Sequence, residues 1–303
     1  MRRIDGTDLY LLFVLGLFRM VEVSRSARLR QSVAAFAANT AYRLSPGNGK
    51  KIRAGLAASG QNHSSADQAK IVRGTFQTFW QDAFLLCEMD LRAELDQVRV
   101  QGLRHLREAQ ARGCGAILLE STFFGYRNLS KRIVHAQGVM PHQTHSPDHL
   151  GGFGVWHPTR LSSSVIRPFF ENREKQFVAS ILYLSATDFA ATRQLSRLLQ
   201  ANELLYISGE GQVGQKFVEL NFLERPQKFA TGATSLAKFS GAPVLPLFCF
   251  RDAASKFQCR IEPPLEFPND ARSAEIGMTH YAALLDKHVR QYPEQYRNWQ
   301  ASN

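Results

Sequence analysis

The sequence predicts an α/β protein with a central mixed, mostly parallel sheet that is flanked by helices and preceded by a helical N-terminal third. Two observations carry this prediction. Up to about residue 93, apolar residues recur at helical spacings. From about residue 98, short apolar runs alternate with segments of helical pattern. Strands separated by helices of roughly 10–15 residues are typical of parallel sheets with helices on both faces.

The N-terminal third reads as a series of helices separated by short breaks. An alanine-rich segment at Ser32–Arg43 is followed by a break at Pro46–Gly49 and a second helix from about Asn48. Ser64 or Ser65 is a suitable N-cap for a long helix that we expect to run to about Met89.

The remainder of the chain predicts the sheet and its covering helices. We expect strands at 98–101, 114–121, 177–184, 203–208, 217–222, 243–251 and 257–262, and helices at 103–112, 126–137, 187–200, 232–240 and 274–292. The segment 142–149 is expected to form a loop, and Arg127, Lys131 and Arg132 to give the helix at 126–137 a basic face. Sites in such sheets lie beyond the carboxyl ends of strands, here at 121–127 and 208–214.

Composition and charge narrow the class of protein. The chain has 303 residues, 44% hydrophobic residues and a net charge of +11, which suits a folded protein with anionic partners. We find no nucleic-acid-binding motif, so we expect a membrane surface and no nucleic acid as partner. A basic soluble protein is the alternative. The four cysteines are far apart in apolar surroundings, which predicts free buried thiols in a reducing compartment.

The N-terminus suggests contact with a membrane. Leu9–Phe18 is strongly apolar but far shorter than the roughly 20 residues that span a bilayer. We therefore expect residues 1–30 to form an amphipathic or membrane-associating helix and residues 31–303 a single domain. We therefore expect a peripheral or N-terminally anchored protein on the cytoplasmic side of a membrane. The alternative is a helix packed on the protein's own core.

Several ordered segments carry a family resemblance. Gly115–Arg127, in which an apolar strand leads into Thr122 and Arg127, resembles the first motif of the lysophospholipid acyltransferase superfamily. Ser208–Gly211 is similar to its third motif, with Glu-Gly kept and Pro lost. Thr231-Gly232 followed by Gly241-Ala242-Pro243-Val244-Leu245-Pro246 resembles the bacterial lipid A late acyltransferases in particular.

The resemblance implies an acyl transfer reaction, but this sequence lacks the two residues that carry out that reaction in the family. In the family, a His acts as general base on an acceptor hydroxyl and an acidic residue orients it. The aligned positions here are Thr122 and Arg127, and neither side chain can serve as that base or that acid near neutral pH.

Three explanations of the departure stay open. Another residue supplies the base, either Glu120 at the strand end or a histidine of the 142–149 segment such as His145. The same segment binds a metal, although its spacing is not a standard zinc pattern and we expect none. The protein has lost catalysis and binds lipid or acyl carrier. Ordinary roles also remain, namely an ion pair between Glu120 and Arg127 and a solvated loop around His145.

The remaining site candidates suit substrate binding. Lys131 and Arg225 match phosphate or phosphopantetheine groups, and the turn at Gly209, Glu210 and Gly211 lets backbone approach a ligand closely. Ser121 shares the strand end with the dyad positions. We expect no cofactor, an acyl-CoA or acyl-carrier-protein donor, and a lipid or other hydroxyl or amine acceptor. A non-catalytic lipid- or acyl-carrier-binding protein on the same fold is the alternative.

Overall fold

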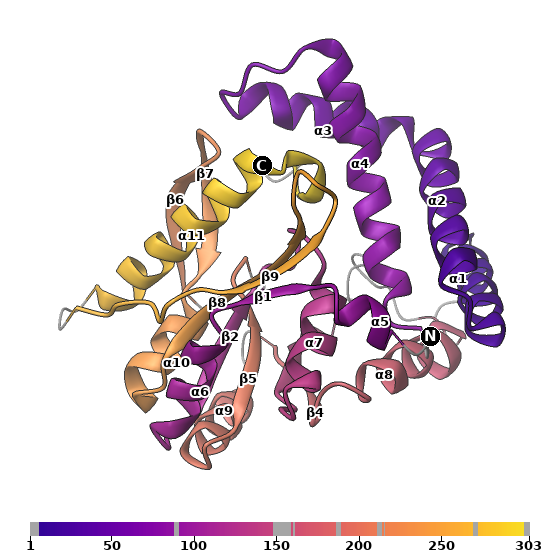
Figure 1. Cartoon of the computed structure of the whole chain (residues 1–303). Helices are drawn as coiled ribbons and strands as arrows, with labels where there is room; N and C mark the ends of the chain where they lie inside the picture. Colours follow the sequence, from indigo (N-terminus) through magenta and orange to yellow (C-terminus); the bar gives the residue numbers. More distant parts are fainter. Residues whose placement is uncertain are drawn as a thin grey trace.

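In the computed structural model, the chain forms an α/β body with helices α1–α4 along one side (Figure 1). The structure describes residues 6–87, 91–147, 159, 161–185, 189–210, 214, 216–268 and 272–299. The predicted fold class is confirmed, because a mostly parallel sheet is flanked by helices and follows a helical N-terminal third.

The central sheet has the strand order β1-β9-β8-β2-β5-β3-β4. All neighbouring pairs run parallel except β8 and β9, which form an antiparallel pair. The strands are β1 (Arg99–Gln101), β2 (Ala116–Glu120), β3 (His142–His145), β4 (Ser180–Tyr183), β5 (Leu204–Ser208), β8 (Val244–Arg251) and β9 (Phe257–Ile261). A separate hairpin pairs β6 (Phe217–Phe222) with β7 (Arg225–Ala230).

Helices α1 to α5 precede the first strand, and the later helices lie between strands or after the last one. The helices are α1 (Gly6–Ser24), α2 (Ala27–Leu44), α3 (Pro46–Ala58), α4 (Ser65–Phe84), α5 (Arg92–Leu95), α6 (Leu103–Ala111), α7 (Arg127–Ala136), α8 (Arg167–Glu174), α9 (Phe189–Gln200), α10 (Gly232–Ser240) and α11 (Ser273–Gln291). A π-helical turn, η2 (Ser162–Ile166), leads into α8, and a 3-10 turn, η3 (Pro293–Gln295), follows α11.

Alternation along β2 divides the core between the two faces of the sheet. Ile117 and Leu119 pack in the same apolar cluster as residues of α9, α10 and α11. Ala116 and Leu118 pack in the opposite cluster, with residues of α6 and α7. Because side chains alternate along a strand, Glu120 continues the row on the α7 face.

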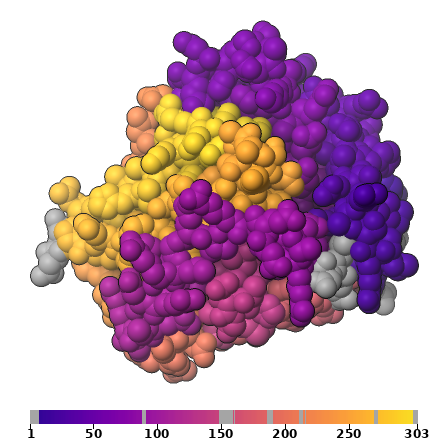
Figure 2. Space-filling view, in the orientation of Figure 1, coloured from indigo at the N-terminus to yellow at the C-terminus, as the bar shows by residue number. Residues whose placement is uncertain are grey.

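The N-terminal helices have a core of their own. Apolar residues of α1, α2 and α4, including Phe18 and Phe84, pack with Phe169 and Phe170 of α8. In the space-filling view, this indigo and purple surface adjoins the α/β body along one side (Figure 2). No helix in the described part of the chain is both long and apolar enough to cross a membrane. The division into residues 1–30 and 31–303 stays a prediction.

In the N-terminal third, the predicted break at Pro46–Gly49 is instead the first turn of α3, and α2 and α3 are separated at Ser45. The predicted cap at Ser64 is confirmed. Ser64 caps α4 by accepting a hydrogen bond from the Asp67 N–H at 3.1 Å. The helix ends at Phe84, however, and not near Met89, since a turn follows directly. All four cysteines are free and three are buried, with Cys114 half-buried.

Two predictions about the site region are wrong. Residues His142–His145 form β3 inside the sheet and not a loop, because their backbone pairs with β4 and β5. Lys131 and Arg132 of α7 are buried and do not form a solvated basic face, since each finds polar partners inside the protein. The sequence reading also left out β7, α5, η2 and α8.

Candidate active site at the carboxyl edge of the sheet

The connection from β2 to α7 holds four predicted site residues: Glu120 ends β2, Ser121 and Thr122 lie in the loop, and Arg127 begins α7. Gly125 allows the loop to turn, because its φ is +68° and an added Cβ would lie 1.9 Å from the Cys249 carbonyl oxygen. The Tyr126 N–H then donates to that carbonyl at 2.7 Å. This anchoring to β8 places Arg127 at the first turn of α7, facing back toward the end of β2.

Glu120 and Arg127 form a buried ion pair. Arg127 Nε donates to Glu120 Oε1 at 2.5 Å, and the side chains are 10% and 2% exposed. Gln143 Nε2 donates to the same oxygen at 3.3 Å. Although burial disfavours its charge, the carboxylates of Glu120 and Glu174 raise the pKa of Arg127. The expected ion pair between Glu120 and Arg127 is therefore present.

A second group of charges adjoins this pair. Lys131 Nζ forms a buried ion pair with Glu174 Oε1, and His145 Nε2 lies 3.0 Å from Glu174 Oε2. Burial opposes the charge of Glu174, but the attraction of His145, Lys131 and Arg127 holds its pKa well below 4.5. We refer to Glu120, Arg127, Lys131, Gln143, His145 and Glu174 as the ionic cluster.

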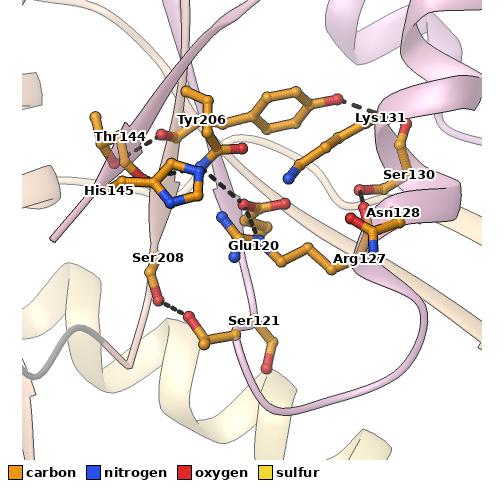
Figure 3. Close-up of polar contacts among 12 residues, drawn as sticks. Glu120, Ser121, Arg127, Asn128, Ser130, Lys131, Thr144, His145, Tyr206 and Ser208 are labelled. Atoms are coloured by element: carbon orange, nitrogen blue, oxygen red, sulfur yellow. Dashed lines mark hydrogen bonds and ion pairs between the residues drawn. The ribbon is translucent and has the colours of Figure 1, made fainter. Parts of the chain in front are cut away.

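Strand register brings His145 level with Glu120. Tyr206 of β5 lies opposite Leu118 of β2 on one side and opposite Gln143 of β3 on the other. His145 is two residues beyond Gln143, and Glu120 two residues beyond Leu118, so both belong to the same row on the α7 face. The close-up shows them on either side of the end of β5 (Figure 3).

A second cluster lies around Glu210. Ser121 Oγ donates to Glu210 Oε1, the Thr122 N–H donates to Oε2 at 3.0 Å, and the Tyr281 hydroxyl donates to Oε2 at 3.3 Å. The Thr122 hydroxyl is hydrogen-bonded to the Ser208 hydroxyl. We refer to these five residues as the Glu210 cluster. Burial raises the pKa of Glu210 despite the hydrogen bonds from Ser121 and Thr122.

Gly209 is required where the chain enters this cluster. An added Cβ would lie 2.1 Å from Tyr281 Cζ and would clash with the hydroxyl end of the ring. The Gly209 N–H donates to the Glu120 carbonyl oxygen at 2.8 Å, which ties the ends of β5 and β2 together. The absence of a side chain thus lets Tyr281 reach Glu210.

The predicted substrate-binding residue Arg225 lies on the β6–β7 hairpin and not at the edge of the central sheet. Arg225 begins β7, directly after the hairpin turn at Leu223 and Glu224, whose φ angles are +51° and +59°. Its charge acts on Tyr296, where it opposes the rise in pKa that burial causes. Gly211 lies outside the described residues.

The sequence reading missed Glu174, Gln143 and Tyr281. Glu174 ends α8, which was not predicted, and Tyr281 lies on α11, about seventy residues after Glu210. Only the alternation of β3 could have placed Gln143 beside His145. Within the described residues, no three His, Cys, Asp or Glu side chains are arranged to hold a metal ion, and Asp148 and His149 lie outside that part of the chain.

The polar side chains of the two clusters gather beyond the carboxyl ends of β2, β3 and β5. Sites in open α/β sheets usually lie at this edge. The chain matches the family described as bacterial lipid A biosynthesis acyltransferase over residues 6–300. Because this match covers nearly the whole chain, the protein belongs to that family. A comparison with curated proteins found no match. Family membership supports acyltransferase-like function, with an acyl donor and a lipid acceptor as the substrate classes.

Proposed function

We propose that this protein is a membrane-associated acyltransferase with a divergent active site. It moves a fatty acyl group from acyl-carrier protein or acyl-CoA to a hydroxyl or amine of a lipid-like acceptor, at the cytoplasmic face of the inner membrane. Membership of the lipid A acyltransferase family supports the reaction class. The observation that carries the proposal is the contact between His145 and Glu174 at the carboxyl edge of the sheet, at 3.0 Å.

His145 takes the part of the missing histidine in this proposal. The carboxylate of Glu174, whose pKa is held well below 4.5, lies 3.0 Å from Nε2 of His145. We infer that this negative charge favours the proton on Nε2 and leaves Nδ1 as the base. The side chain of His145 is 11% exposed, whereas Glu174 is 8% exposed. A base with a buried carboxylate behind it and a small exposed surface matches the arrangement that activates a nucleophile.

The proton and electron pairs balance in one transfer cycle. His145 Nδ1 removes the proton from the acceptor hydroxyl as its oxygen attacks the thioester carbonyl carbon. The carbon–sulfur bond then breaks, and the leaving thiolate takes the proton from the imidazolium. Glu174 stabilises the imidazolium between these two steps, and Lys131 keeps Glu174 in place.

Membrane contact is supported by the surface of α1. Leu9, Phe13 and Val23 are 63%, 51% and 85% exposed although the helix also buries Val14 and Phe18. A helix that packs on the protein with one face and exposes large apolar residues on another suits the acyl–headgroup boundary. The two readings of the N-terminal helix are thus compatible.

A non-catalytic lipid- or acyl-carrier-binding protein is the second candidate. The two positions that correspond to the family's His and acid favour this candidate, because both side chains are already engaged within the protein. The Thr122 hydroxyl is hydrogen-bonded to Ser208, and Arg127 pairs with Glu120. The Glu120 side chain is 2% exposed, and its Oε1 already accepts hydrogen bonds from Arg127 and Gln143, so an acceptor hydroxyl has less access to it than to His145. Glu120 is therefore the weaker candidate for the base.

Acyl transfer from labelled acyl-carrier protein or acyl-CoA to a total lipid extract separates the two candidates. We expect His145→Ala to lower turnover by roughly a hundredfold or more. His142→Ala is the matched control, because His142 lies on the same strand and contacts Ser180 instead. Full turnover by a folded His145→Ala variant contradicts the assignment of the base. Saturable lipid binding without product from any donor establishes the binding protein instead.

A further inference from the structure

A pocket outside both clusters lies between α2, the end of α4 and the β8–β9 hairpin. It has a volume of about 290 Å³ when its open mouth is included. Its lining consists of Arg30, Gln31, Ala34, Gln81, Leu85, Arg251 and Phe257. These described lining residues include two arginines and no carboxylate.

Both arginines carry donors without a partner in the described part of the protein. Arg30 is 6% exposed and pairs with Glu94 through Nη2, but its Nη1 is buried without a partner among the described residues. Arg251 Nε is likewise buried and unpartnered within the described part of the chain. Buried guanidinium donors that lack partners are rare, because each loses its hydration. Two of them at one pocket point to an anion.

The charge around the pocket is also predominantly positive. Arg132 interacts with Arg30, and burial followed by repulsion from Arg30 lowers the pKa of Arg132 to about 10. Arg132 makes its hydrogen bonds to the carbonyl oxygens of Leu85 and Cys87, which carry no formal charge. Within the described residues, the lining arginine Arg30 forms an ion pair with Glu94 and the lining arginine Arg251 forms none, so the pocket wall keeps a net positive charge. An anion balances it.

The walls give the ligand a polar end and a less polar end. The guanidinium carbon of Arg251 lies 4.3 Å from the centre of the Phe257 ring, a cation–π contact that holds the side chain at this wall. The Tyr126 hydroxyl donates to Gln81 Oε1 at 2.8 Å, which leaves the amide NH₂ of Gln81 as a further donor. Ala34 and Leu85 provide apolar contact.

We propose that this pocket binds the phosphate group of a phosphate monoester, with Arg30 and Arg251 as its ligands. A monoester carries a charge of about −1.5 to −2 at pH 7 and three acceptor oxygens, which fits two guanidinium groups and an amide. Its short organic part lies against Ala34, Leu85 and Phe257. The site is separate from the proposed acyl transfer site, and its binding is measured without an acyl donor.

Calorimetric titration with glycerol 3-phosphate and with inorganic phosphate at constant ionic strength tests the proposal. We expect saturable binding to the wild type and a Kd roughly tenfold higher or more in Arg251→Gln. Arg30→Gln is expected to behave alike. The matched control is Arg28→Gln, an exposed arginine on α2 that does not line the pocket, which should leave the Kd unchanged.

Arg251→Gln keeps the test sound if loss of Arg30 impairs folding. The backbone of Arg251 is held by Gln295 through two hydrogen bonds, at 2.8 Å and 2.7 Å, that do not involve the side chain. Flotation with phosphatidylcholine vesicles, with and without phosphatidic acid, identifies the source of the monoester. Capture that requires phosphatidic acid and Arg251 assigns a lipid, whereas binding of the soluble probes alone assigns a free monoester. Equal affinity in wild type and Arg251→Gln, or no binding of any probe, overturns the proposal.

Discussion

Arg127 Nε lies 2.5 Å from Glu120 Oε1, so the cation at the start of α7 takes its counter-charge from the end of β2. Both side chains are almost fully buried, and Gln143 of β3 also donates a hydrogen bond to Glu120 Oε1. The two charges of the pair are balanced locally, whereas neither residue alone would be. Stability should therefore respond very differently to the loss of one charge and to the loss of both.

We expect Glu120→Gln to lower the free energy of unfolding by about 3 kcal/mol, because Arg127 is left buried without its carboxylate. The double variant Glu120→Gln/Arg127→Met should regain most of this loss, since it removes both charges. Urea unfolding followed by circular dichroism measures both values. A single variant as stable as the wild type contradicts a structural role for the pair.

The acid stability of the protein should depend on Glu174. Its pKa is held well below the ordinary 4.5 in the folded state, chiefly by His145 and Lys131, which overcome the effect of burial. The unfolded chain then takes up this proton first as the pH falls below 4.5, so stability present above that pH is lost on acidification. The slope that one such carboxyl adds is at most about 1.4 kcal/mol per pH unit.

Glu174→Gln removes this contribution, although it also lowers stability at neutral pH by leaving Lys131 without its carboxylate. The free energy of unfolding should therefore fall less steeply between about pH 5 and pH 3 in the variant than in the wild type. Urea titrations at several pH values give the two slopes. Glu171→Gln, which removes a carboxylate from the same helix outside the ionic cluster, gives the comparison. Parallel profiles for Glu174→Gln and the wild type would refute the assignment.

The sequence was most informative where one physical cue decides the structure. The apolar run ending at Glu120 predicted a central strand, and helical spacing predicted α9, α10 and α11 with bounds close to those found. β3 was missed because His142–His145 is polar, and a strand of this composition is stabilised by its neighbours and not by its own pattern.

The candidate site was predictable only in part for a related reason. Glu120, Thr122 and Arg127 follow one strand, so sequence order alone places them together. The partners of His145 depend on the path of the chain through α8, which brings Glu174 back to the sheet edge from 29 residues further along. Such contacts arise from tertiary packing, and no local pattern signals them.

Gly209→Ala should destabilise the protein by several kcal/mol, because the new Cβ would lie 2.1 Å from Tyr281 Cζ in a fully buried ring. Gly232→Ala is its matched control, since nothing lies within 4 Å of the added atom and alanine favours the helix. That variant should be neutral or more stable by about 0.5–1 kcal/mol. Thermal unfolding compares the two, and equal effects would mean that the contact between Gly209 and Tyr281 is not close.

If α1 binds the membrane, replacing its exposed Phe13 should weaken vesicle binding, whereas replacing the exposed Phe239 of α10 should not. Phe13 of α1 is 51% exposed beside the other apolar residues of that helix, whereas Phe239 of α10 is 85% exposed at the opposite end of the molecule (Figure 1). Placing a phenylalanine side chain in the acyl boundary is worth roughly 1.5–3 kcal/mol. Phe13→Glu should thus weaken binding to vesicles of bacterial inner-membrane lipid by about tenfold or more, and Phe239→Glu should have little effect. Co-sedimentation at varied lipid concentration gives both affinities. If Phe13→Glu binds as tightly as the wild type, α1 is not the membrane-facing element and its exposed apolar residues serve another contact.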